Sequence, residues 1–199
     1  MKIISWNLLH SVGAGAEEVA RLAVREHPDL LLMQETTIGI DRLPSLIGGF
    51  YARDPLPGRL HGLAAWSPVP FRCPPSPLLL QPGIIVKRVC QIIELPEFGV
   101  ANVHLSHGQV LNRRQLRRIA AILPARAAIL GDCNLVGPPL LPGFHDAGPR
   151  RATHVAGDLF PVRLDRCFIR GLEAHDTRLL AMGGSDHHPI VVTLLSPEP

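Results

Sequence analysis

The chain has 199 residues, of which 46% are hydrophobic and 19% charged, and this globular composition excludes an intrinsically disordered protein. Its formal net charge of +3 permits contact with nucleic acid or acidic lipid but does not require it. No run of 18 uninterrupted apolar residues occurs, so we expect no membrane span. The length predicts a single domain over residues 1–199.

Hydrophobic patterning and turn residues predict the secondary structure. In chain order we expect a strand over 2–6, a helix over 16–26, strands over 30–33, 63–66, 84–94 and 100–105, a basic helix over 112–123, and strands over 127–130, 164–169 and 190–195. Residues 55–82 are rich in proline and glycine, which indicates short strands and turns. Many strands with two clear helices predict mixed sheets faced by helices, an α/β sandwich.

The four cysteines, Cys73, Cys90, Cys133 and Cys167, form no CxxC pair, so we expect buried thiols rather than disulfides or zinc ligands. The chain starts with MKIISWN and shows no long apolar leader before the first strand. We therefore expect a reduced, soluble, cytoplasmic protein. No feature of the sequence argues for a dimer, so a monomer is expected.

Polar side chains recur where the apolar strands begin or end. They are Asn7, Glu35, His104, Asp132 with Asn134, Asp165, and Asp186 with His187. Catalytic groups and ligands commonly collect at one rim of a sheet, because the core holds the strand ends rigidly. Each residue also has a plain structural interpretation: a turn for Asn7, a core histidine for His104, an ion pair with a neighbouring arginine for Asp165. A single shared site explains all six positions together.

These positions resemble the motifs of a known superfamily. The segments SWN at 5–7, QE at 34–35, NVHLSHG at 102–108, GDCN at 131–134, LDR at 164–166 and SDHHP at 185–189 occur in the order typical of the endonuclease/exonuclease/phosphatase superfamily, the DNase I-like fold. The resemblance spans residues 3–195. It implies a four-layer α/β/β/α sandwich, in which two packed mixed sheets are flanked by helices, and hydrolysis of a phosphate ester with Mg²⁺ or Mn²⁺.

The resemblance also implies roles for single residues. Glu35 and Asn7 would bind the metal, and Asp186 would join a second metal, since hard cations prefer such oxygen ligands. Asp132 and Asn134 would position the attacking water and the phosphate. The base is left open between Asp132 and His187, which Asp165 would orient through a hydrogen bond. His104 would donate to the phosphate or serve as the general acid. His188 is expected to point away from its neighbour.

Two features bear on the branch of the superfamily. Abasic-site endonucleases of this type usually carry a tyrosine at the position of His104, whereas the histidine resembles the DNase I, sphingomyelinase and sugar-phosphatase branches. DNase I-type enzymes pair this histidine with a glutamate from the preceding strands, but residues 50–93 contain no glutamate, and Asp54 is their only acid. The partner of His104 therefore stays open.

Three functions remain after these observations. The first is a sequence-nonspecific nuclease that contacts the phosphate backbone of DNA or RNA through loop arginines: Arg53, Arg59, Arg150, Arg151 and Arg163. The second is a phosphoesterase for a small phosphate ester or a lipid head group; the lipid case would need an exposed apolar loop, for which 138–144 is the candidate. The third is a non-catalytic binding module. For the arginines of the helix at 112–123 we expect a solvated face.

Overall fold

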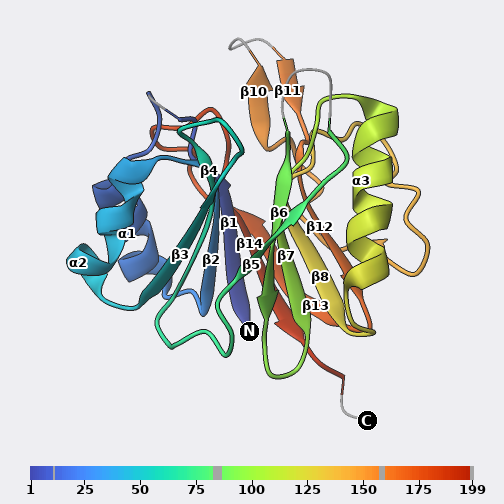
Figure 1. Ribbon diagram of the computed structural model, residues 1–199, viewed down its shortest axis with the longest axis horizontal. Coiled ribbons are helices and arrows are strands. Elements are labelled where there is room, and N and C mark those ends of the chain that lie inside the picture. Colours follow the sequence, from blue (N-terminus) through green and yellow to red (C-terminus); the bar gives the residue numbers. More distant parts are fainter. Residues whose placement is uncertain (11, 83–86, 157–159, 198–199) are drawn as a thin grey trace.

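The computed structural model describes residues 1–10, 12–82, 87–156 and 160–197, and it consists of two six-stranded sheets packed between helices (Figure 1). The first sheet has the order β13 (Glu173–Leu179), β14 (Ile190–Leu195), β1 (Lys2–Asn7), β2 (Leu30–Thr36), β4 (Gly62–Ser67) and β3 (Phe50–Pro55). The second has the order β5 (Ser76–Leu79), β6 (Val89–Glu94), β7 (Gly99–His104), β8 (Ala127–Asp132), β12 (Asp165–Arg170) and β9 (His145–Asp146).

Helices cover the outer face of each sheet. The first sheet carries α1 (Ala16–Glu26), the 3-10 helix η1 (Ile38–Arg42) and α2 (Leu43–Ile47), and the second carries α3 (Gln109–Ile122) (Figure 1). A small hairpin of β10 (His154–Ala156) and β11 (Phe160–Val162) stands at one end of the sandwich. The predicted fold class, a four-layer α/β/β/α sandwich, is confirmed. Among the described residues no helix has the length and apolar character needed to cross a membrane.

Each sheet contains one parallel pair whose crossover is a helix. Strands β1 and β2 are parallel and joined through α1, and strands β7 and β8 are parallel and joined through α3. The other pairs of the two sheets are antiparallel, so both sheets are mixed. The carboxyl ends of parallel neighbours share one edge, and the registers place Asn7 beside Gln34 and His104 beside Asp132.

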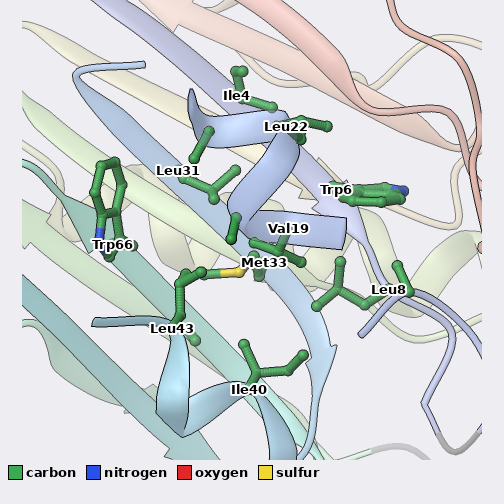
Figure 2. Close-up of a cluster of buried hydrophobic side chains, with 14 of the residues drawn as sticks. Ile4, Trp6, Leu8, Val19, Leu22, Leu31, Met33, Ile40, Leu43 and Trp66 are labelled. Atoms are coloured by element: carbon green, nitrogen blue, oxygen red, sulfur yellow. The ribbon is translucent and has the colours of Figure 1, made fainter. Parts of the chain in front are cut away.

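Alternate residues of the central strands pack on opposite faces of their sheet. In β1, Ile3 belongs to the core between the two sheets, whereas Ile4 and Trp6 pack under α1. Figure 2 shows the helix-side core, in which Val19 and Leu22 of α1 meet Leu31 and Met33 of β2. A third core lies between the second sheet and α3. Full burial of such a side chain contributes roughly 1.5–3 kcal/mol, so the central strands are firmly held.

Some predicted bounds differ from the structure. Helix 16–26 and strand 190–195 have the bounds expected. The strand expected at 84–94 begins at Val89, and residues 84–86 of that prediction lie outside the described part of the chain. The helix expected at 112–123 begins earlier, at Gln109, because the extended backbone of Gly108 is its N-cap. Cys73 is exposed, contrary to expectation, while the other three cysteines are buried, and all four are free.

Several elements were not predicted, and their sequences explain why. Strand β13 (EAHDTRL) lies at an edge of the first sheet with its side chains exposed or half-buried, so it lacks an apolar alternation. Strand β3 occupies the opposite edge and is likewise only half-buried. Helix α2 is a five-residue segment, too short for a helical period to emerge from the sequence.

Candidate active site

The structure brings the polar strand-end residues to one end of the sandwich, the end at which the β10–β11 hairpin lies in Figure 1. Asn7 ends β1, Glu35 lies near the end of β2, and His104 and Asp132 end the parallel strands β7 and β8. Asp165 begins β12, which runs antiparallel to β8, so it stands directly opposite Asp132. Asp186 and His187 precede β14, the antiparallel neighbour of β1.

Asp132 is the centre of this cluster, and it is almost fully buried. Its Oδ2 accepts a hydrogen bond from Asn7 Nδ2 at 3.0 Å and lies 3.3 Å from His104 Nε2. Its Oδ1 accepts the main-chain N–H of Asn134 at 3.0 Å. The Nε2 of His187 lies 3.9 Å from Oδ2. Four residues from four separate segments of the chain thus surround one carboxylate.

A glycine allows Asp132 to reach this position. Gly131 has φ of +141°, a value that side-chain-bearing residues rarely adopt. A Cβ at this position would lie 2.0 Å from the carbonyl oxygen of Val103 on the neighbouring strand. Gly131 therefore lets β8 approach β7 closely, and the carboxylate of Asp132 follows directly in the chain.

Asn134 reaches the cluster mainly through its backbone. Its φ is +47°, in the left-handed region, and its main-chain N–H is the group bonded to Asp132. Its side-chain Nδ2 donates to the carbonyl oxygen of Leu105 at 3.0 Å, and its own carbonyl accepts from Gln109 and Asn112 of α3. Asn134 thus fixes the loop that follows β8 against the start of α3.

His187 is held by a buried carboxylate. Its Nδ1 lies 2.7 Å from Asp165 Oδ2, and both side chains are buried. Burial alone would lower the pKa of His187, but the charge and hydrogen bond of Asp165, helped by Asp132 and Asp186, raise the pKa to about 9. The imidazolium therefore sits among three carboxylates, with its Nε2 facing Asp132 and Asp186 at 3.9 Å each.

The backbone around His187 is tied to the first strand. Trp6 Nε1 donates to the His187 carbonyl oxygen at 3.0 Å, and Ser185 Oγ donates to the Asn7 carbonyl oxygen at 2.7 Å. The same Ser185 oxygen accepts the His187 main-chain N–H at 3.1 Å. His188 turns the other way, and its Nδ1 lies 2.8 Å from the Leu180 carbonyl oxygen.

His104 is neutral and enclosed. Burial lowers its pKa to about 3, although Asp132 opposes this effect. Its Nδ1 lies 3.8 Å from Glu35 Oε1, and its Nε2 faces Asp132. Residues 50–93 supply no glutamate partner for His104. Glu35 and Asp132 are instead the acids that lie beside its ring.

Glu35 sits at an irregular point of β2 and directs its carboxylate toward the same end. Its φ is +57°, and the pairing of β2 with β4 shifts register between Gln34 and Thr36. Its Oε2 accepts the main-chain N–H of His10 at 3.1 Å and contacts the His10 ring. Burial would raise the pKa of Glu35, but these His10 contacts outweigh it and hold the pKa below its ordinary value. Glu35 is thus ionised at neutral pH.

Glu35 and Asn7 fit a hard divalent cation. Oε1 of Glu35 has no hydrogen bond within the described ranges, and the Asn7 Oδ1 accepts only the main-chain N–H of Leu9, at 3.2 Å. An ionised carboxylate and an amide oxygen are the donors that Mg²⁺ and Mn²⁺ prefer. Asp186 lies instead beside His187 and His154.

Three further residues at the site were missed from the sequence. Arg88 precedes β6 and is buried; this burial lowers its pKa, while Asp132 and Glu35 oppose the shift by attraction. Arg88 fell within the strand predicted over 84–94, and nothing in the sequence marked it as a site residue. His10 binds Glu35 from an irregular loop, and its ring stacks on His61 with centroids 4.1 Å apart. His154 of β10 lies with its ring centroid 4.4 Å from that of His187.

Two adjoining cavities open beside Glu35. The first, of about 400 Å³, is lined by Leu8, His10, Glu35 and α1 residues that include Glu17. The second, of about 650 Å³, is lined by His10, His61, Arg53, Arg59 and the exposed Leu60. They share His10, Thr37 and Ile38, and only the first cavity is lined by Glu35.

The arginines expected to reach a phosphate backbone differ in availability. Arg53 forms two hydrogen bonds with Asp41, at 2.6 and 2.9 Å, and Arg163 forms two with Asp146, both at 2.7 Å. Arg59 and Arg151 are exposed.

On α3, Arg113 binds the carbonyl oxygens of Val136 and Pro138, while Arg114, Arg117 and Arg118 are exposed, as a solvated helix face would be.

The chain was compared with known proteins. A family model described as the Endonuclease/Exonuclease/phosphatase family matches residues 4–187. No curated protein matches. Among solved structures, an endonuclease/exonuclease/phosphatase from Beutenbergia cavernae DSM 12333 is 16% identical with a TM-score of 0.76, covering 98% of this chain and 71% of that one.

Two other solved structures have the same fold. A mannosyl-6-phosphatase from Bacteroides thetaiotaomicron VPI-5482 is 15% identical with a TM-score of 0.76, covering 98% of this chain and 99% of that one. The TDP2 protein of D. rerio, complexed with single-strand DNA product, is 16% identical with a TM-score of 0.76, and the coverage is 98% of each chain.

Proposed function

The chain belongs to the endonuclease/exonuclease/phosphatase family, and from this premise we propose that it hydrolyses phosphate esters with a divalent metal ion, with the backbone of DNA or RNA as substrate. The observation that carries the proposal is the convergence on Asp132 of Asn7, His104 and His187, each from a different segment. Groups held on rigid strand ends are suited to a fixed reaction geometry.

Glu35 and Asn7 are the residues proposed to hold the metal ion, Mg²⁺ or Mn²⁺. The ion would polarise a phosphoryl oxygen and offset the charge that develops on it. The contacts of His10 with Oε2 of Glu35 support this role, because they orient the carboxylate and leave Oε1 for the ion. His10 is thus proposed as a positioning residue.

Asp132 is proposed as the base. A water bonded to its carboxylate would attack phosphorus, the bond to the leaving oxygen would break, and the water proton would pass to Asp132. The leaving oxygen would take a proton from solvent to become a hydroxyl. Asn7 and the main-chain N–H of Asn134 orient the two carboxylate oxygens. The neighbouring His104, being neutral, would keep Asp132 oriented without adding a second positive charge.

His187 is proposed to donate a hydrogen bond from Nε2 to a phosphate oxygen. Its Nδ1 is committed to Asp165, so only Nε2 faces the reaction. Three carboxylates surround the ring, which favours the cationic form and supports a donor rather than a base. Arg88 would supply a second cationic group for the phosphate, since its side chain is buried and its charge is attracted by Asp132 and Glu35.

A nucleic-acid substrate is supported by the exposed Arg59, which lines the second cavity, and by the DNA product in the structure of the D. rerio TDP2. A phosphoesterase for a small organic phosphate is the second candidate. The cavity of about 650 Å³ has the size of many small-molecule sites, and the Bacteroides neighbour is named as a mannosyl-6-phosphatase. The loop at 138–144 gives little support for a lipid surface, because Leu141 and Phe144 are buried.

Supercoiled plasmid, incubated with the protein in Mg²⁺ and separately in Mn²⁺, tests the proposal. Nicking that disappears with EDTA and with Asp132→Asn, but persists with His188→Ala, would support a nuclease. An intact plasmid combined with hydrolysis of a simple phosphomonoester, under the same controls, would assign the small-ester function. Hydrolysis of neither substrate would contradict the proposed activity and favour a binding module.

A further inference from the structure

Helix α3 carries four arginines that no acidic side chain neutralises. Arg114, Arg117 and Arg118 are exposed, and Arg113 is half-buried. The ion pairs that arginines form within the described residues all lie elsewhere, at Arg25, Arg42, Arg53, Arg163, Arg166 and Arg178. We propose that α3 is a second contact surface for nucleic acid, outside the proposed reaction centre, and that its arginines bind the phosphate backbone. This inference rests on the proposed function and adds a contact to the same substrate.

The charge pattern of α3 differs from that of α1, the helix on the opposite side of the sandwich. On α1, the first turn holds two acids, and Arg25 forms an ion pair with Glu26 at 3.1 Å. The sequence of α3, QVLNRRQLRRIAAI, contains no acid. Like charges three or four positions apart on a helix repel each other, so the arginine cluster destabilises the helix in the free protein. A bound polyanion would remove that repulsion.

The chain around α3 is also poor in acids. Residues 98–145 span β7, α3 and β8 and contain five Lys or Arg but a single acid, Asp132, whereas the rest of the chain contains fifteen Lys or Arg and sixteen Asp or Glu. Asp132 is buried in the site, so this segment presents no carboxylate to solvent. The excess positive charge of the protein is therefore concentrated around α3, and such a concentration attracts polyanions.

The start of α3 lies against the proposed reaction centre. Gln109 and Asn112 donate to the carbonyl oxygen of Asn134, whose main-chain N–H is bonded to Asp132. From there α3 runs along the outer side of the sandwich, away from the end that carries the β10–β11 hairpin (Figure 1). At a rise of about 1.5 Å per residue, the first and second exposed turns of arginine lie roughly 8 and 14 Å beyond the start of the helix. A nucleic acid that extends from the reaction centre along α3 would meet them in succession.

Arg114 and Arg118 are the arginines best placed to take a phosphate. Neither forms a hydrogen bond with a side chain or carbonyl of the described residues, whereas Arg113 donates to main-chain carbonyl oxygens of the loop after β8 and Arg117 lies 3.5 Å from another. The planar guanidinium group can bind a phosphate through two parallel hydrogen bonds. Contacts of this kind hold a nucleic acid without reading its sequence, as the proposed nonspecific activity requires.

An anionic membrane is the other polyanion that a basic helix could meet. A helix that binds a lipid surface buries its apolar face in that surface. The apolar face of α3, with Leu116 and Ile119, is instead buried against the second sheet. The exposed Val110 and Ile122 stand at opposite ends of the helix and form no common patch. The surface therefore favours the backbone of a nucleic acid, and vesicles serve as the comparison.

Fluorescence anisotropy with a short labelled DNA duplex, in EDTA so that no metal-dependent cleavage occurs, tests the proposal. We expect the double variant Arg114→Gln/Arg118→Gln to weaken binding about tenfold and to reduce the slope of log K against log salt concentration by roughly 1–2, because each lost phosphate contact contributes about 0.9. Arg21→Gln/Arg25→Gln, an equally spaced pair of exposed arginines on α1, is the matched control and should bind as the unchanged chain does.

Kinetics give a second readout. Because Arg114 and Arg118 lie outside the proposed reaction centre, the double variant should hydrolyse a small phosphodiester at the original rate, while KM for plasmid rises and kcat stays the same. Circular dichroism checks the fold of both double variants.

Unchanged affinity and salt slope in the α3 variant would overturn the proposal, as would an equal loss in the α1 control. An unchanged chain that fails to bind DNA, or that binds phosphatidylserine vesicles more tightly than DNA, would also overturn it. The binding measurement involves no turnover, so it separates the two proposals. DNA binding through α3 without hydrolysis would support this surface and reject the activity, whereas nicking with unchanged KM in the α3 variant would support the activity and reject this surface.

Discussion

His104 and Asp132 are the last paired residues of the parallel strands β7 and β8, and their side chains meet at the end of the sheet, with His104 Nε2 3.3 Å from Asp132 Oδ2. The backbones of both strands are fixed by the core, so this contact requires no loop to be ordered. The relationship makes Asp132 the first group to alter in a test of the proposed chemistry.

Asp132→Asn keeps the shape of the side chain but removes the carboxylate that is proposed to accept the proton of water. We expect kcat to fall by about 10²–10⁴-fold, the usual contribution of a general base. Steady-state hydrolysis at saturating Mg²⁺ measures this effect, with circular dichroism to check the fold. Activity above a tenth of the original would exclude Asp132 as the base.

Glu35→Gln should weaken metal binding and leave the fold intact. The variant removes the charge while leaving an oxygen to accept from His10, so we expect the Mg²⁺ concentration for half-maximal activity to rise at least tenfold. Mn²⁺ binding followed by electron paramagnetic resonance gives the same quantity without turnover. Glu94→Gln, an exposed acid at the far end of β6, is the matched control. An unchanged metal dependence would place the ion elsewhere.

Arg88→Met should lower activity without lowering stability. The guanidinium is buried and its Nε has no hydrogen bond among the described residues, so an apolar side chain of similar length should leave stability unchanged or raise it. Loss of the proposed phosphate contact should raise KM or lower kcat/KM by at least tenfold. Urea unfolding and steady-state kinetics measure the two quantities. Normal kinetics in a destabilised variant would show that Arg88 is structural.

Gly131→Ala should destabilise the protein strongly. The added Cβ would lie 2.0 Å from the Val103 carbonyl oxygen, at a φ that alanine rarely adopts. We expect a loss of about 2–4 kcal/mol in the free energy of unfolding, together with loss of activity as Asp132 is displaced. Gly39→Ala, where the nearest atom would be 3.6 Å away, is the control and should be nearly neutral. Equal stability of the two variants would contradict the close approach.

Glu26 should make stability depend on pH in acid. The hydrogen bond that Glu26 accepts from Arg178 lowers the pKa of Glu26 from 4.5 to about 2. Burial opposes this shift, and hydrogen bonds from Arg25 and Lys2 add to it. Because the folded pKa is the lower one, the contribution is full above pH 4.5 and is lost as the pH falls toward 2. The stability difference between the natural chain and Glu26→Gln, measured by urea unfolding, should therefore shrink between pH 5 and pH 2. A constant difference would show that the contacts are not formed in solution.

The sequence predicted the fold well because the central strands are continuous apolar runs and the motif residues follow them directly. Gly131 with Asp132, and Asn102 to His104, lie within or directly after buried strands, so a linear pattern places them at one rim. Residues outside such runs were missed. Arg88 precedes a strand, His10 lies in an irregular loop, and His154 belongs to a three-residue strand with no apolar period. Their positions depend on tertiary contacts that local patterns do not encode.

The hydrogen bond from Ser185 to the carbonyl oxygen of Asn7 joins residues that are 178 positions apart in the chain. Strand β1 lies between β14 and β2, so β1 pairs with a strand that is synthesised much later. A ribosome that is still holding β14 therefore carries a chain in which Asn7, Glu35 and Asp132 are present but His187 cannot yet be in place. Contacts of such long sequence separation also form slowly. The chemistry proposed for the site can thus begin only once β14 has been made and has paired with β1, and a chain that stops before Ser185 would be inert.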